Sequence, residues 1–412
     1  MLDIRFYDNG DKKISLFLTM ELLIPAVKFC IVQSIPGLSA FNSIANIIIS
    51  AILFCFILNA IKPILKRSGT FSILVFFLLI LFLSVEILIY PENRDNIISS
   101  IFGIFGVSFI CFIASYSLND CKILYNYLTV ASYIIISFGF FMFIATTIWG
   151  VVGTAETQTN MSLSYYILIP IMLMLHIWIS NSGKKGFIAF VFVCIGMLVM
   201  IGMGSRGPLL AIALFFLLDS LKLIKNNWHA IIKFFTVMLI SIFSFIFMNK
   251  LLEVGIKLFD LVGINSRTLR AVLIGNIAGL SNRDVFAGVS IDMIKEHPLL
   301  GVGFLGYLSS HNIFLETWLF YGIIIGSLFL IVYVFLQIKT LFLGRFGLNE
   351  ESLTVVWLFF SYETIDSFLN LTVWGKDMFW IYLGLIFSIL LKRKKDLRRS
   401  ELNIGTSITH WQ

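Results

Sequence analysis

Apolar stretches of about 20 residues recur along nearly the whole of this 412-residue chain. A helix of that length crosses the hydrocarbon core of a bilayer, which is about 30 Å thick. Charged residues make up 13% of the chain, about half of what a soluble domain carries. A transmembrane barrel is excluded as well, because its strands alternate apolar and polar residues and leave a less hydrophobic chain. The sequence therefore predicts an all-α polytopic membrane protein.

Twelve candidate spans can be delimited, and we expect each to form one transmembrane helix. They are Ile14–Ile35, Ala40–Ile61, Thr70–Tyr90, Ile97–Leu118, Leu128–Trp149, Ser162–Ser180, Phe187–Met203, Gly207–Ile224, Trp228–Leu251, Ile313–Leu336, Ser352–Leu371 and Trp374–Leu391. The chain is thus expected to be a single integral membrane domain over residues 1–412.

Lysine and arginine residues set the expected orientation. An even number of spans places both termini on one side, and most basic residues fall on that side, six of them in the segment KRKKDLRR at 392–399. Basic residues favour the cytoplasmic side of a membrane. Both termini are therefore expected in the cytoplasm, with a basic tail over 392–412. The net charge of +7 follows from these basic edges and gives no reason to expect a nucleic-acid partner.

One long loop, over residues 253–310, is predicted on the opposite, outer side. Its length indicates a function of its own. Within it Ser281 is a predicted N-cap, and Phe286, Val289, Met293 and Ile294 share one face at helical spacing. Pro and Gly residues over 298–306 then predict a turn region. We expect this amphipathic helix to lie along the outer membrane surface.

Four residues on the outer side are candidates for chemistry: Arg206, Arg267, Arg283 and His311. Arg206 precedes a predicted helix N-terminus, where unpaired N–H groups favour an anion. Arginine binds phosphate through a permanent, bidentate charge, and histidine exchanges its proton near neutral pH. This combination suits a reaction that activates a hydroxyl while a phosphate-bearing group leaves.

Each candidate also has a plainer interpretation. Arg206 alone is more often an anchor for lipid phosphate, and Arg283 alone is more often a solvated residue of a first helical turn. His311 alone is more often a hydrogen-bonded interfacial histidine than a base. The hypothesis of a site rests on their occurrence together around one structured loop.

Several other polar residues lie within the apolar spans. Glu363 and Asp366 share a helical face, and a proton or cation path through them stays open. For Lys28 and Glu86 we favour a structural role. Glu316 follows His311 by five residues and is expected to line the same pocket. The four remaining histidines, among them His176, are expected to be incidental. Metal-ligand spacing and a Walker-type glycine loop are not found in the sequence, so we expect no metal and no cofactor.

The segment SNRDVFAGVSIDMIKEHPLLGVGFLGYLSSHNIFLETWLFYGIIIG, at 281–326, closely resembles the signature region of the O-antigen polymerase and ligase superfamily, Wzy-type polymerases and WaaL-type ligases. The segments GSRGPLL and NSRTL resemble that family's other arginine segments. The resemblance covers about 125 residues. It implies a membrane-embedded glycosyltransferase of GT-C type in the bacterial inner membrane, independent of metal, with the long loop in the periplasm and a glycan on undecaprenyl pyrophosphate as donor.

The resemblance also implies roles for individual residues. Arg206 and Arg283 would hold the pyrophosphate, with help from Arg267, and His311 would be the general base. Substrate binding would involve Asn312 and Glu316. Direct displacement at the anomeric carbon would invert its configuration. A chain-length regulator is an expected partner on the same ground.

Three functions remain open at this stage. Ligases of this superfamily tend to show His-Asn, nine residues, Gly and, three residues further, a small or hydroxyl residue. His311, Asn312 and Gly322 fit this pattern and Ile325 does not, which favours the polymerase over transfer of the glycan to lipid A–core. A polysaccharide flippase is the alternative from another class, because flippases also have many spans with interior charges.

Overall fold

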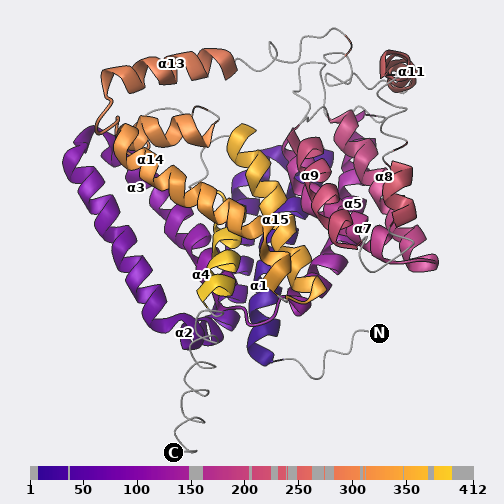
Figure 1. The fold of residues 1–412 in the computed structure, drawn as a ribbon, viewed down its shortest axis with the longest axis horizontal. Helices are drawn as coiled ribbons and strands as arrows, with labels where there is room; N and C mark the ends of the chain where they lie inside the picture. The colour runs from indigo at the N-terminus through magenta and orange to yellow at the C-terminus, as the bar shows by residue number, and fades with distance from the viewer. Residues whose placement is uncertain are drawn as a thin grey trace, which may run out of the picture.

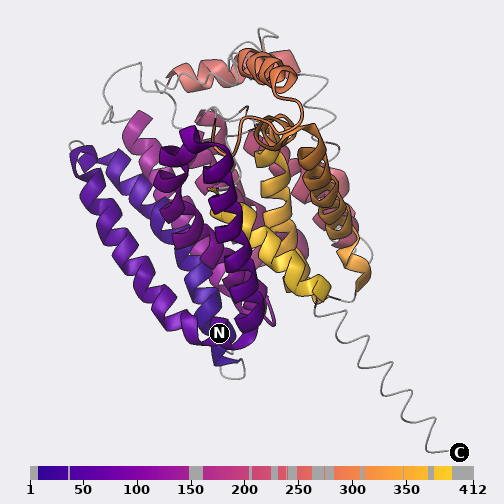
Figure 2. The same cartoon turned by 90° about the vertical axis from the view of Figure 1, so that its left-hand side faces the viewer.

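The computed structural model describes residues 8–35, 38–147, 161–203, 207–223, 231–237, 239, 248–261, 273, 283–306, 310, 312–346, 348–369 and 375–391. The described residues form helices and connecting turns, with no strand among them. Most of the helices stand side by side in a bundle, while α11 (Met248–Leu261) and α13 (Arg283–Glu296) lie across one end of it (Figures 1 and 2). We call the end covered by α13 the upper face, and the end where α1 begins the lower face.

Six helical segments of the described residues are long and apolar enough to cross a membrane. They are α1 (Asn9–Ser34), α2 (Asn42–Ile89), the continuous segment Pro91–Ser117 that contains α3 (Arg94–Gly103) and α4 (Phe109–Ser117), the part Lys122–Ala145 of α5 (Lys122–Thr147), α8 (Lys184–Gly202) and α14 (Ile313–Leu341). Two shorter apolar helices are α7 (Leu168–Ser180) and Asp377–Leu391. The described chain is thus multi-pass and all-helical, as predicted, with six such segments where twelve spans were expected.

The 48-residue helix α2 contains two of the predicted spans. Its contacts with α1 and α4 show that it does not run straight. Its first half is antiparallel to α1: Lys28 donates to Asn46 at 2.6 Å, and Gly10 packs against Pro63. Its second half is antiparallel to α4: Phe71 stacks on Tyr116 at a ring-centroid distance of 4.2 Å, and Phe76 contacts Phe109 in a tilted arrangement at 5.7 Å. The chain therefore turns back near Pro63, at the lower face.

The centre of the bundle is formed by α7, α9 (Gly207–Leu223), α15 (Glu350–Leu369) and the helix Asp377–Leu391. Nearly every residue of α7 is buried, and α15 is buried along most of its length. By contrast, α2 and the lower part of α14 expose many large apolar side chains. A protein surface this apolar matches contact with lipid rather than water. The described chain is completed by α6 (Met161–Tyr166), a short helical segment at 231–237, and the short turns η2 (Leu38–Phe41), η3 (Pro91–Asn93), η4 (Ile104–Ser108) and η5 (Leu343–Phe346).

The predicted tenth span is broken, which corrects the expectation of one continuous helix. Gly322 has φ 72° and ψ 175°, so α14 consists of a short piece before Gly322 and a long piece after it. Val302 and Gly303 donate their backbone N–H groups to the carbonyls of Leu319 and Phe320 at 2.8 and 3.1 Å. The Ile323 N–H donates to the Pro298 carbonyl at 2.8 Å. Backbone N–H and carbonyl groups at a helix end have no partner within the helix, and a bilayer offers them none. These hydrogen bonds therefore satisfy the backbone at the break.

The limits of the predicted outer loop also need correction. We expected a span to end at Leu251, but α11 begins at Met248 and continues to Leu261. Its polar residues all fall within one narrow arc of the helix, while the remaining positions are apolar or Gly. The second loop helix is present, but its predicted apolar face is only partly buried: Val289 is 38% exposed, and the predicted N-cap Ser281 lies outside the described residues. α13 begins at Arg283, and its Met293 and Ile294 pack with Phe304 and Leu319 of the segment below it.

We predict that Gly322→Ala prevents correct assembly of the upper face. A Cβ atom at this position would lie 2.1 Å from the Leu299 carbonyl oxygen, and the positive φ is itself unfavourable for alanine. We expect a loss of about 2 kcal/mol or more in stability, measured by thermal unfolding of the purified protein in detergent. The control is Gly288→Ala in α13, where a Cβ meets nothing within 4 Å. Equal unfolding temperatures for both variants would contradict this account.

Candidate functional site

The predicted site residues fall partly within the described structure. Arg206, Arg267 and His311 lie outside the described residues. Arg283 is the first residue of α13, and only its backbone is described. Asn312 is the N-cap of α14, where its side-chain oxygen accepts from the N–H groups of Phe314 and Leu315 at 2.9 and 3.4 Å.

The described neighbours of two candidates meet at the upper end of α15. Phe314, three residues after His311, packs its ring against Phe368 at a centroid distance of 5.4 Å. Gly207, which follows Arg206 and begins α9, lies against Leu369 and the Tyr165 hydroxyl. The last turn of α15 is therefore flanked by the starts of α14 and α9. Helix N-termini favour anions, and at the start of α14 the Asn312 side chain already accepts from two of the N–H groups.

Glu316 lies in the first turn of α14 and is 3% exposed. Its backbone N–H donates to the Asn312 carbonyl at 2.9 Å. A buried carboxylate one turn from the helix start lies close to where the sequence placed the pocket. The structure thus puts Asn312 and Glu316 at the same end of the bundle as Gly207 and Leu369.

The turn that follows α13 is held by three side chains from the α2–α3 junction. Glu86 accepts from the Phe304 N–H at 2.8 Å, the Tyr90 hydroxyl donates to the Leu300 carbonyl at 2.8 Å, and Asn93 donates to the Val302 carbonyl at 2.9 Å. The structural role expected for Glu86 is confirmed.

A buried polar cluster lies directly below the end of α15. Lys376 forms an ion pair with Asp366, which is 1% exposed. One helical turn lower, Glu363 is fully buried and accepts from the Ser367 hydroxyl, which in turn accepts from Tyr333 at 3.1 Å. The second oxygen of Glu363 has no hydrogen-bond partner within the described part of the chain.

A second acidic pair continues this cluster toward α1. Asp377 accepts from the Ser108 hydroxyl at 2.9 Å. Glu21 is 6% exposed, and one of its oxygens has no partner among the residues that the structure describes. The sequence indicated polar residues in these spans. It did not show that Lys376, at the start of the last span, forms an ion pair with Asp366 of the preceding helix, α15.

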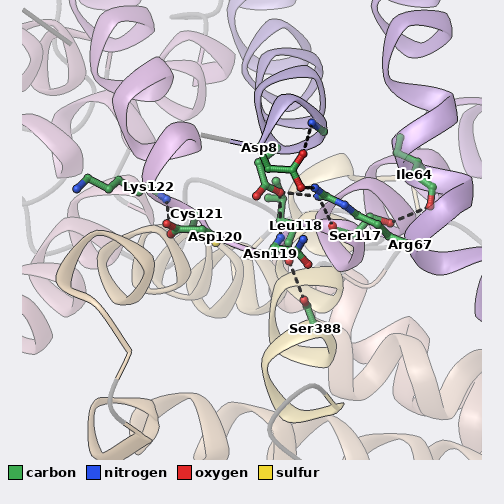
Figure 3. Close-up of polar contacts among 12 residues, drawn as sticks. Asp8, Ile64, Arg67, Ser117, Leu118, Asn119, Asp120, Cys121, Lys122 and Ser388 are labelled. Atoms are coloured by element: carbon green, nitrogen blue, oxygen red, sulfur yellow. Dashed lines mark hydrogen bonds and ion pairs between the residues drawn. The ribbon is translucent and has the colours of Figure 1, made fainter. Parts of the chain in front are cut away.

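A separate polar network ties four segments together at the lower face (Figure 3). Arg67 pairs with Asp8 and with Asp11, at 2.6 Å from the latter, and donates to the Ser117 carbonyl at 3.0 Å. Asp11 also accepts from the Asn119 N–H at 3.0 Å. Since these groups satisfy one another, the network fixes the α2 turn and leaves little to bind a ligand.

His176 was expected to be incidental, and this was wrong. It is 3% exposed, and its Nδ1 lies 2.9 Å from both carboxylate oxygens of Asp219, which is fully buried. The Tyr125 ring packs edge-on against the imidazole. The pair joins α7 to α9 near the lower face. The sequence signal for this pair was that His176 and Asp219 are polar residues at matching depths of two separate apolar spans.

The described part of the chain contains no group of three or more His, Cys, Asp or Glu residues arranged to hold a metal ion. What the upper end of α15 offers among the described residues is two neighbouring helix starts and, below them, the acidic cluster that contains the Lys376–Asp366 ion pair. Comparison with protein-family models and with curated proteins finds no match. The function must therefore be argued from the residues themselves.

We predict that Lys376→Met destabilises the protein by about 3 kcal/mol, because it leaves the buried Asp366 carboxylate without its cation. The double variant Lys376→Met with Asp366→Asn should recover much of this loss. Thermal unfolding in detergent measures both, and Lys185→Met, at an exposed position of α8, is the matched control. If the double variant is no more stable than Lys376→Met, the ion pair is not the cause.

The Asp8 carboxylate should make stability depend on acid pH. The hydrogen bond from the Gly10 N–H lowers the pKa of Asp8. Burial acts in the opposite direction, and the positive charge of Arg67 lowers the pKa further. A lowered folded-state pKa gives stability that is present above the ordinary value of 3.8 and is lost as pH falls through the folded value. Unfolding temperatures of wild type and Asp8→Asn should therefore differ by a constant amount above about pH 5 and converge as pH falls below about 4. A difference that stays constant through this fall in pH would contradict the assignment.

Proposed function

We propose that this protein is a surface-polysaccharide polymerase of the O-antigen type. It joins oligosaccharide repeat units carried on undecaprenyl pyrophosphate, at the periplasmic face of the bacterial inner membrane. The observation that carries the proposal is the meeting of the α14 and α9 starts at the last turn of α15. These starts are the described neighbours of His311 and Arg206, which the motif resemblance makes a base and a phosphate ligand.

The reaction needs one base and fixed positive charge. His311 takes the proton from an acceptor hydroxyl of one repeat unit, and the resulting oxygen attacks the anomeric carbon of the other. The bond from that carbon to the pyrophosphate oxygen breaks, and the pyrophosphate leaves on its lipid. Arg206 and Arg283, assisted by Arg267, stabilise the charge that develops on it. Because the attack is a direct displacement, the product linkage has inverted configuration.

Several features of the described structure support this proposal. The helices α11 and α13 cover the upper face, where a lipid-linked head group would be kept from bulk water (Figure 1). Asn312 caps α14 and Glu316 is buried one turn later, so both help to fix the helix start that the proposal places beside the acceptor. A metal is not required, because pyrophosphate is already a good leaving group.

The ligase is the nearest alternative, since both reactions use the same donor. Gly322, the position that ligases share, is the break of α14 and has a structural reason to be glycine. Ile325 is 53% exposed on the long piece of α14, where a lipid-facing apolar residue suffices. This departure from the ligase pattern favours a polymerase.

The transporter alternative is favoured by one observation, the buried cluster of Glu363, Asp366 and Lys376. Two carboxylates and one ammonium within a bundle are typical of proton or cation paths. The same groups also suit a polymerase, in which they support the end of α15 beside the reaction site. Activity of the purified protein separates these functions.

We predict that His311→Ala abolishes polymerisation. In a Gram-negative host that makes O-antigen, deletion of the gene should collapse the lipopolysaccharide ladder on a silver-stained gel to core plus one repeat unit. A plasmid with wild type should restore the ladder, and His311→Ala should not. The control is His297→Ala at the end of α13, an exposed histidine, which should restore it fully. Bare core with accumulated lipid-linked polymer would identify a ligase instead.

We further predict that purified protein in detergent consumes lipid-linked repeat units without any ion gradient. Glu363→Gln should retain this activity to within about tenfold, because the residue does not act on the substrate. Arg283→Lys should lower it by at least about a hundredfold, because a bidentate phosphate contact is lost. A wild-type protein that leaves the lipid-linked units intact would favour the transporter, and NMR of the product tests the inverted linkage.

A further inference from the structure

An apolar groove lies on the outside of the α1–α2 hairpin, away from the upper end of α15. It has a volume of about 380 Å³ and is lined by residues of three helices, among them Leu23, Val27 and Lys28 of α1, Ile49 of α2 and Phe138 of α5. Every lining residue is half-buried, so the groove is open at the surface of the bundle. Lys28 is its one charged lining residue.

The charge of Lys28 is not neutralised by the described protein. Its ammonium donates to the Asn46 side-chain oxygen at 2.6 Å, and none of the ion pairs among the described residues includes it. Asn46 belongs to the first two turns of α2, which also contain Asn42 and Ser43. Polar residues at the start of an otherwise apolar helix mark the level of the lipid head groups. Lys28 therefore lies where a phosphate of the bilayer would be.

Most of the groove extends from Lys28 toward the bilayer centre, with Ile31 one turn on the other side. Because α1 rises from the lower face, Val27 and Leu23 lie progressively deeper than Lys28. From Lys28 to Leu23 the groove covers five helical steps, or about 8 Å. One leaflet of hydrocarbon is about 15 Å thick, half of a core of about 30 Å. A positive group near the surface and an apolar channel that stays within one leaflet match a phosphate head above the upper part of an acyl chain.

We propose that this groove is a binding site for one glycerophospholipid of the bilayer. Its phosphate contacts the Lys28 ammonium, and one acyl chain lies against Val27, Ile49 and Phe138. The groove adjoins the first half of α2, whose Ile44, Ile47, Ile48 and Ile52 are exposed and face lipid. A far longer polyprenyl chain would extend well beyond a groove of this length, so the membrane's own phospholipid is the occupant. This site is independent of the function proposed above.

The test is retention of a defined lipid by the full chain in detergent, counted by native mass spectrometry. Wild type should hold one dioleoyl-phosphatidylglycerol and should not hold dioleoylglycerol, which has the same chains without a phosphate. Lys28→Met should lower occupancy about fivefold, since one basic residue at the membrane surface attracts an anionic lipid by about that factor. Val27→Trp should abolish it by filling the groove.

Two matched variants serve as controls. Ile52→Trp places the same side chain on the exposed face of α2, outside the groove, and Lys185→Met removes an exposed lysine of α8. Both should retain lipid as wild type does. Equal retention by Lys28→Met and wild type, or of dioleoylglycerol and phosphatidylglycerol by wild type, overturns the proposal. Recovery of a polyprenyl phosphate in place of phospholipid overturns the stated occupant. If Val27→Trp does not fold, the head-group comparison on wild type still decides.

Discussion

The upper half of this protein depends on how the backbone is satisfied at the break of α14. A helix interrupted within an apolar span exposes carbonyls on one side of the break and N–H groups on the other, and lipid offers them no partner. The turn that follows α13 supplies both kinds of partner through Pro298, Val302 and Gly303. Its close approach requires glycine at 301, 303 and 322, each with positive φ. The loop and the broken helix are therefore one unit.

This unit determines where the candidate site lies. The short first piece of α14 lies near the upper face (Figure 1), and its start reaches the end of α15 through Phe314 and Phe368. A continuous helix would have no reason to bend its first turns over the bundle. The same turn is anchored to α2 and α3 through Glu86, Tyr90 and Asn93, so residues some 210 positions apart in sequence hold one surface together. We infer that the site's shape is fixed by backbone contacts more than by its polar side chains.

The sequence predicted the class of fold well and its interruptions poorly. Apolar length alone located α1, α5, α8 and the helices over 94–117 and 350–369, because burial in lipid is the main requirement for each. The break at Gly322 was not predicted, since its cause lies in Leu299, more than 20 residues away. The extent of α11 was misjudged because its apolar face continues the hydropathy of the preceding span. The motif residues predicted Asn312 and Glu316 near one helix start, whereas the pairing of Lys376 with Asp366 depends on packing that no local pattern records.

The pairing of buried charges differs between the two faces. Near the lower face Arg67 is matched by Asp8 and Asp11, His176 by Asp219, and Lys233 by the carbonyls that end α7. Toward the upper face Lys376 is matched by Asp366, but Glu21 and Glu363 each keep an oxygen without a partner in the described structure, and Lys28 has only an amide. An unpartnered buried polar group costs stability, so its retention indicates a use other than folding. The lower face is thus built to hold the bundle together, and the upper half is where ligands are expected to complete it.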